Sequence, residues 1–319
     1  MGLGTGIMKG IMRALGALPL GFHYACAGFL SWMLKDVLRY RRDVVMTNLA
    51  RSFPDKDYKE LKAISDRFYE HFGNILAETV WFGGCRDPRR LHRKRLVEYS
   101  GIEEFEEAYS RSRGAVVLNS HFGNWELLGG CLEYDYRGEG PVGELVEPPA
   151  LRQAQGPVGP GIDDVVFVHK PLKSRMWEEV MRENRCAPVL RMGYRGYMST
   201  DNILRFALEN KDRKMVYNFP TDQYPYRNSM TDEEVVFMHQ ETKTMVGAAS
   251  LARKLGYAVF YMRLRPVRRG RYEWSFTRIC QDASQMGTHD IMQRYYDLLQ
   301  ADLEENPWCY LWTHKRWKK

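Results

Sequence analysis

A histidine and a carboxylate, His121 and Glu126, flank four residues in the segment VVLNSHFGNWELLGG. On one continuous helix they would point roughly 140° apart, so they can meet only if His121 leaves a strand and Glu126 begins the next helix. Ser120 and Asn124 could each cap such a helix, and Gly123 permits a sharp turn. Glu126 would then accept a hydrogen bond from one imidazole nitrogen, which leaves the other as a base. The nucleophile would come from the substrate.

The composition limits the classes of protein that could use this pair. The chain has 319 residues, 44% hydrophobic and 13% aromatic, which is enough for one large α/β core or at most two. A formal net charge of +7 suits anionic partners such as nucleic acid, acidic lipid headgroups or an acidic carrier protein. The 6 cysteines show no C-x-x-C and no zinc spacing, so we expect reduced thiols and no metal site.

The N-terminal part contains the uncharged run ALGALPLGFHYACAGFLSWML. A bilayer core of ~30 Å requires a helix of ~20 apolar residues, so this run can anchor the chain in a membrane. The basic residues of KDVLRYRR, directly after it, favour a cytoplasmic location for the rest. Because Pro19 and His23 weaken a spanning helix, a helix lying in the membrane interface is one alternative. Ala25-Cys26-Ala27 resembles the small-residue cleavage site of a signal peptide, so a cleaved signal peptide is another. We assign residues 1–40 to this anchor.

The remainder, residues 41–319, alternates between apolar strands and helices and is expected to form one domain. The segment KELKAISDRFYEHFGNILAETVWF has helical apolar spacing, and its His71 is interpreted as a structural residue. Strands separated by helices predict an α/β fold with a mixed, largely parallel sheet flanked by helices. The expected strands are 115–120, 165–169, 187–191, 214–219, 258–264 and 272–279, and the expected helices are 124–134, 173–185, 200–210, 245–255 and 288–305.

Two segments are notable for composition rather than periodicity. Residues 138–164 are rich in glycine and proline, and we expect an inserted, disordered surface loop there. Residues 86–95, RDPRRLHRKR, are strongly basic, and they are interpreted either as a contact to anionic headgroups or as a solvated helix face.

Five segments in order resemble the late acyltransferases of lipid A biosynthesis, within the His-x4-Asp/Glu glycerolipid acyltransferase superfamily. They are YRRDVVMTNLARSFPDK, SHFGNWE, NFPTDQYP, FMHQETKTMVGAASLARKLG and YLWTHKRWK. The resemblance implies a glycerolipid acyltransferase-like fold and transfer of a fatty acyl group to a hydroxyl of a lipid A precursor. It further implies His121 as general base, Glu126 as its orienter, and oxyanion donors among the backbone amides near Gly123 and Asn124.

The resemblance also implies partners and binding residues. The donor would be an acyl carrier protein or coenzyme A thioester, with no other cofactor, and the acceptor an anionic glycolipid at the cytoplasmic side of an inner membrane. Solvated or structural roles are the competing interpretation for several of the binding candidates. Those candidates are Asn124, Arg191, Arg195, Asp222, Gln223 and Arg316.

The sequence departs from the family pattern at a few places. Related chains are usually compact where this chain has the 138–164 insertion. They commonly carry glycine at the position of His239, and many carry asparagine at that of Ser174. These departures leave the acceptor and the acyl length open. An acyltransferase for another glycolipid or an aminolipid is therefore an alternative, and an inactive membrane adaptor is another. A nucleic-acid binder is disfavoured, because no RNP-like strand or helix-turn-helix pattern is present.

Overall fold

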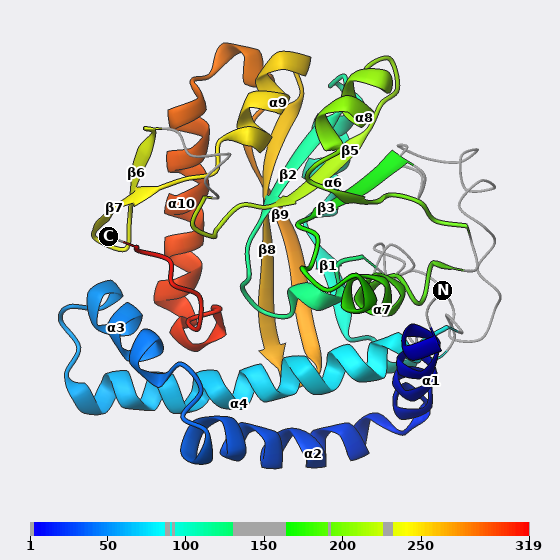
Figure 1. Cartoon of the computed structure of the whole chain (residues 1–319). Coiled ribbons are helices and arrows are strands. Elements are labelled where there is room, and N and C mark those ends of the chain that lie inside the picture. The colour runs from blue at the N-terminus through cyan, green and yellow to red at the C-terminus, as the bar shows by residue number, and fades with distance from the viewer. Residues whose placement is uncertain are drawn as a thin grey trace.

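The centre of the molecule is one seven-stranded sheet (Figure 1). The computed structural model describes residues 3–86, 90, 93–129, 164–190, 193–225 and 232–318. The strand order is β1-β9-β8-β2-β5-β3-β4, and every neighbouring pair is parallel except β8 and β9, which confirms the predicted mixed, largely parallel sheet. The strands are β1 (Val97–Ser100), β2 (Ala115–Asn119), β3 (Val165–His169), β4 (Tyr197–Ser199), β5 (Val216–Pro220), β8 (Ala258–Arg268) and β9 (Arg271–Cys280), with a separate hairpin of β6 (Glu234–Phe237) and β7 (Gln240–Lys243).

Helices cover both faces of this sheet. Along β2, Val116 and Leu118 join one buried cluster while Ala115 and Val117 join the other, as the two-residue period of a strand requires. The α-helices are α1 (Leu3–Ala17), α2 (Leu20–Trp32), α3 (Arg42–Ser52), α4 (Tyr58–Gly83), α6 (Ile102–Ser110), α7 (Arg175–Arg185), α8 (Ile203–Glu209), α9 (Gly247–Leu255) and α10 (Thr288–Glu305). Shorter helical segments are η1 (Met33–Val37), η2 (Trp125–Leu127), η8 (Ala283–Gln285) and η9 (Pro307–Cys309).

The longest helix, α4, lies across one end of the sheet, with α2 beside it (Figure 1). Its start is fixed by a capping box: the Asp57 carboxylate accepts from the Glu60 backbone amide at 2.8 Å, and the Glu60 carboxylate accepts from the Asp57 amide at 2.9 Å. Apolar residues on its inner face then join the core. This helix therefore connects the N-terminal helices to the sheet.

The predicted N-terminal anchor is two helices rather than one. α1 and α2 meet at a bend of 109°, because Pro19 occupies the N-cap of α2 and cannot continue α1. In the part of the chain that the structure describes, no single helix is long and apolar enough to cross a membrane, although the bent pair passes that test on length and composition.

Two other predictions need correction, and one residue of the basic cluster has a contact that was not predicted. Residues 187–190 form turns after α7 instead of a strand, because Pro188 has no amide hydrogen for a ladder and the Val189 amide bonds back to the Cys186 carbonyl. The predicted helix 124–134 is only the 3₁₀ turn η2 over its described residues. Within the basic cluster, Arg90 donates to the carbonyls of Gly16 and Leu18, so its guanidinium supports the junction of α1 and α2.

Candidate active site

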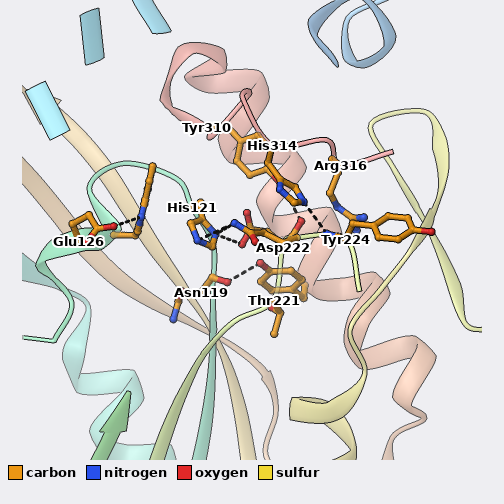
Figure 2. Close-up of polar contacts among 12 residues, drawn as sticks. Asn119, His121, Glu126, Thr221, Asp222, Tyr224, Tyr310, His314 and Arg316 are labelled. Carbon is orange, nitrogen blue, oxygen red and sulfur yellow. Dashed lines mark hydrogen bonds and ion pairs between the residues drawn. The ribbon is translucent and has the colours of Figure 1, made fainter. Parts of the chain in front are cut away.

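The site forms where three parallel strands end together. β2, β5 and β3 are neighbours, so their carboxyl ends lie at one edge of the sheet. His121 follows β2 by two residues, and Asp222 follows β5 by two residues. Their side chains point toward each other across this edge (Figure 2).

His121 is bonded to Asp222. The imidazole Nδ1 lies 2.8 Å from Asp222 Oδ1, and because a carboxylate only accepts, Nδ1 carries the hydrogen. Burial alone would raise the pKa of the Asp222 carboxyl, but the charge and hydrogen bond of His121 hold it below its ordinary value. Nε2 is left as an acceptor, and the Gln223 side-chain amide donates to it at 3.1 Å. The His121 side chain is 19% exposed and that of Asp222 only 1%, so the acceptor nitrogen belongs to the accessible member of the pair.

Glu126 does not hold His121, which corrects the predicted pair. Its carboxylate receives Arg185 Nε at 2.6 Å and Nη2 at 2.8 Å, and the Trp125 indole N–H at 3.2 Å. Burial would raise the pKa of Glu126, but the Arg185 guanidinium lowers it, so the carboxylate is ionised. The physical reason is that Arg185, at the end of α7, is a charged bidentate donor, and the Glu126 carboxylate binds such a donor more strongly than a single imidazole N–H.

The loop between these two residues is tightly constrained. Gly123 has φ of +62°, and a Cβ there would lie 2.0 Å from the Leu264 carbonyl oxygen, so only glycine fits. The Gly123 amide donates to the Cys309 carbonyl at 3.0 Å, and the Leu311 amide donates to the His121 carbonyl at 3.0 Å. The Gly123 amide is thus already bonded, which removes it from the predicted oxyanion donors.

Three buried tyrosines hold the strand ends in place. The hydroxyls of Tyr295, Tyr296 and Tyr310 donate to the carbonyls of Asn119, Thr221 and Asp222, at 2.8, 3.0 and 3.2 Å respectively. Each carbonyl flanks the His121–Asp222 pair, so the C-terminal helix and tail fix the backbone on both sides of it.

The remaining predicted binding residues are placed as follows. Asn124 is fully buried, and its side-chain oxygen accepts from the Glu126 amide at 3.2 Å, so it caps η2 as predicted for a capping residue. Arg316 is also buried, and its Nη2 donates to the Lys243 carbonyl and the Tyr296 hydroxyl, both at 2.8 Å, which is a supporting position.

Of the two other predicted arginines, the structure describes only Arg195, which does not reach the pair. Arg195 is exposed and precedes β4, so it stands at the amino edge of that strand, away from the edge that carries His121. Arg191 lies outside the described residues, as do residues 138–163 of the predicted insertion.

Sequence reasoning missed two functional features of the site. It treated Asp222 as a binding residue or a structural residue, whereas this carboxylate is the partner of His121. It did not single out Arg185, because one arginine at the end of a charged amphipathic helix carries no local signal.

Over the described residues, no cluster of three or more metal-ligating side chains occurs.

Comparison with known proteins adds independent information. A family model described as bacterial lipid A biosynthesis acyltransferase matches residues 3–156 and 191–319, which is most of the chain. A comparison with curated proteins found no match.

Proposed function

The chain belongs to the bacterial lipid A biosynthesis acyltransferase family, an acyltransferase family, and on that premise we propose that it moves a fatty acyl group from a carrier thioester to a hydroxyl of a lipid A precursor. The observation that carries the proposal is the imidazole of His121, held through Nδ1 by the buried Asp222 carboxylate with Nε2 available as a base. His121 is then the general base and Asp222 its orienter. Glu126 supports the loop through Arg185.

The reaction uses one base and no enzyme nucleophile. His121 Nε2 takes the proton of the acceptor hydroxyl while its oxygen attacks the thioester carbonyl carbon, and a tetrahedral oxyanion forms. The C–S bond then breaks, the carbonyl re-forms as an ester, and the thiolate leaves with the proton returned by the imidazolium. During the step in which His121 is charged, the Asp222 carboxylate stabilises that charge across 2.8 Å.

The oxyanion needs hydrogen-bond donors close to the reacting carbon. Gln223 Nε2 lies 3.1 Å from the catalytic nitrogen, so its amide stands beside the position of the incoming hydroxyl. When substrate replaces the contact between Gln223 and His121, this amide can donate to the oxyanion. Gln223 is thus proposed as an oxyanion donor, which is a more specific role than the predicted one of substrate binding.

Positive charge near the same edge suits an anionic acceptor or carrier. Lys170 directly follows β3, and Lys318 Nζ lies 4.8 Å from the centre of the Tyr224 ring, two residues beyond Asp222. Burial lowers the pKa of Lys170, the nearby Asp201 carboxylate opposes this shift, and the charges of Lys173 and Lys318 lower the pKa further, so these lysines share one region. A phosphorylated glycolipid or an acidic acyl carrier protein would be attracted there.

Membrane attachment is proposed through the outer surface of α1 and α2, on the cytoplasmic side of an inner membrane. On α1, Leu3, Ile7, Ile11 and Leu15 recur every four residues and are all exposed. On the other side of the same helix, Lys9 and Arg13 form ion pairs with Glu183 of α7. Exposed aromatic residues extend the apolar surface along α2. An apolar stripe on a helix docked to its own protein supports insertion into the interface rather than spanning.

Mass spectrometry of lipid A and total polar lipids tests the proposed function. Cells would carry the wild-type gene, His121→Ala, His289→Ala or a deletion, where His289 is an exposed histidine on α10 that serves as the matched control. We expect lipid A to lack one acyl chain in the deletion and the His121→Ala cells only. An unchanged lipid A with a deacylated aminolipid or other glycolipid would redirect the acceptor, and activity in His121→Ala would refute the base.

A further inference from the structure

Two polar side chains on the inner face of α4 reach the catalytic loop. His71 and Glu78 are seven residues apart, which is close to two helical turns, so they share one face of the helix. Both are buried, with 6% of His71 exposed and none of Glu78. A polar group is buried at this depth only where hydrogen bonds compensate for lost water. Their partners therefore show what the two residues do.

Glu78 is a buried carboxyl that receives three donors. Its Oε2 accepts from the Asn124 side-chain amide at 2.7 Å and from the Tyr272 hydroxyl at 2.7 Å. Its Oε1 accepts from the Tyr24 hydroxyl of α2 at 2.8 Å. Since the Asn124 oxygen in turn accepts from the Glu126 amide, Glu78 fixes the residue that starts η2.

His71 holds the preceding residue of the same loop. Its Nε2 lies 3.1 Å from the Gly123 carbonyl oxygen, and because a carbonyl only accepts, Nε2 carries the hydrogen. Burial lowers the pKa of His71 to about 4, so the ring is neutral at neutral pH and keeps this one donor in place. The loop is thus held at two consecutive residues, Gly123 and Asn124, by one helix.

We propose that α4 is a two-point support for the catalytic loop, with Glu78 a positioning residue that acts on His121 through Asn124. This inference rests on the proposed function, because it assigns Glu78 to the efficiency of the same reaction. Glu78 does not touch the reacting atoms. It sets the path of the backbone from His121 to Glu126, and a displacement of catalytic groups by ~1 Å can cost about 10²-fold in rate.

A reciprocal exchange of the two side chains tests the support. Asn124→Asp keeps a capping oxygen for the Glu126 amide but places a second acid against the Glu78 carboxyl. We expect kcat to fall about 10-fold to 100-fold with little change in KM. We also expect faster hydrogen–deuterium exchange over residues 119–128. Adding Glu78→Gln lets the new glutamine amide donate to the new aspartate carboxylate, which is the wild-type hydrogen bond with donor and acceptor exchanged. The double variant should therefore recover most of the lost kcat and of the lost protection from hydrogen–deuterium exchange.

A control separates positioning from general stability. Tyr24→Phe removes a donor to the opposite carboxylate oxygen and touches no part of the loop, so it should lower the midpoint of thermal unfolding while kcat and loop exchange stay as in wild type. A double variant no better than Asn124→Asp in kcat and exchange would overturn the proposal, and so would wild-type exchange in Asn124→Asp. If the wild-type enzyme transfers no acyl group, the proposed function has failed, and loop exchange alone then decides whether α4 supports the loop.

Discussion

Replacing Asp222 by asparagine should nearly abolish acyl transfer while the protein stays folded. The substitution keeps the size of the side chain and one oxygen that can accept from His121 Nδ1. It removes the negative charge that stabilises the imidazolium formed during proton transfer. An asparagine amide that flips toward Nδ1 would also favour the tautomer with hydrogen on Nε2, which cannot act as a base.

The size of the loss follows from the contact. Two unit charges with centres about 4 Å apart attract by about 4 kcal/mol at an effective dielectric constant near 20. A tenfold change in rate corresponds to about 1.4 kcal/mol, so complete loss would reduce kcat by about 10³-fold. Since the His121 side chain is 19% exposed, water screens part of this interaction, and a loss of roughly 10²-fold to 10³-fold is expected.

Single-turnover kinetics with an acyl carrier protein thioester would measure this effect. Glu126→Gln is the matched control: it also removes one buried carboxylate from the loop, but it leaves Arg185 without its ion-pair partner. We expect that control to lower the free energy of unfolding by about 3–5 kcal/mol, with kcat of the folded protein reduced less than about tenfold. Wild-type kcat in Asp222→Asn, or an equal loss in folded Glu126→Gln, would refute Asp222 as the orienter.

Three further predictions concern the loop, acid stability and the membrane. Gly123→Ala should lower both the midpoint of thermal unfolding and kcat, because its Cβ would meet the Leu264 carbonyl at 2.0 Å; unchanged melting and turnover would contradict this. Burial holds the pKa values of His71 and His314 at about 4, below the ordinary 6.5, so unfolding takes up protons below about pH 6.5 and stability falls toward pH 4. The free energy from urea titrations should drop by about 1.4 kcal/mol per pH unit per histidine, and His71→Phe should flatten that slope. Phe29→Asp on the exposed side of α2 should weaken sedimentation with anionic vesicles, whereas Leu204→Asp, also exposed but on α8, should not.

Much of the fold follows from local signals. The segment 288–305 has strong helical periodicity and matches α10 residue for residue, and the apolar run 165–169 is β3. β4 was missed because three residues are too few to show a period, and its only described ladder contacts are to β3. Residues 187–190 misled the prediction because buried turns are as apolar as strands: Ala187 and Val189 are both fully buried.

The sequence predicted the loop that carries His121, but it did not predict which carboxylate binds the imidazole. The spacing of His121 and Glu126 correctly placed a loop between them, and Asn124 caps the following turn as expected. The partner of His121 comes from the end of a neighbouring strand about a hundred residues later, and no local spacing encodes that approach. Glu126 instead binds Arg185 of α7, a long-range contact that depends on the packing of that helix against α1 and α4.

The catalytic loop is held by residues near the C-terminus, so it can be completed only at the end of synthesis. A chain that folds while it is being synthesised presents α1, α2 and His121 early. The hydroxyl that holds the Asn119 carbonyl comes from Tyr295, 176 residues further along, and the carbonyl that fixes Gly123 comes from Cys309, later still. The proposed membrane-binding helices can therefore emerge before the catalytic loop is supported, and we expect acyl transfer to begin only after the last helix and the tail have docked.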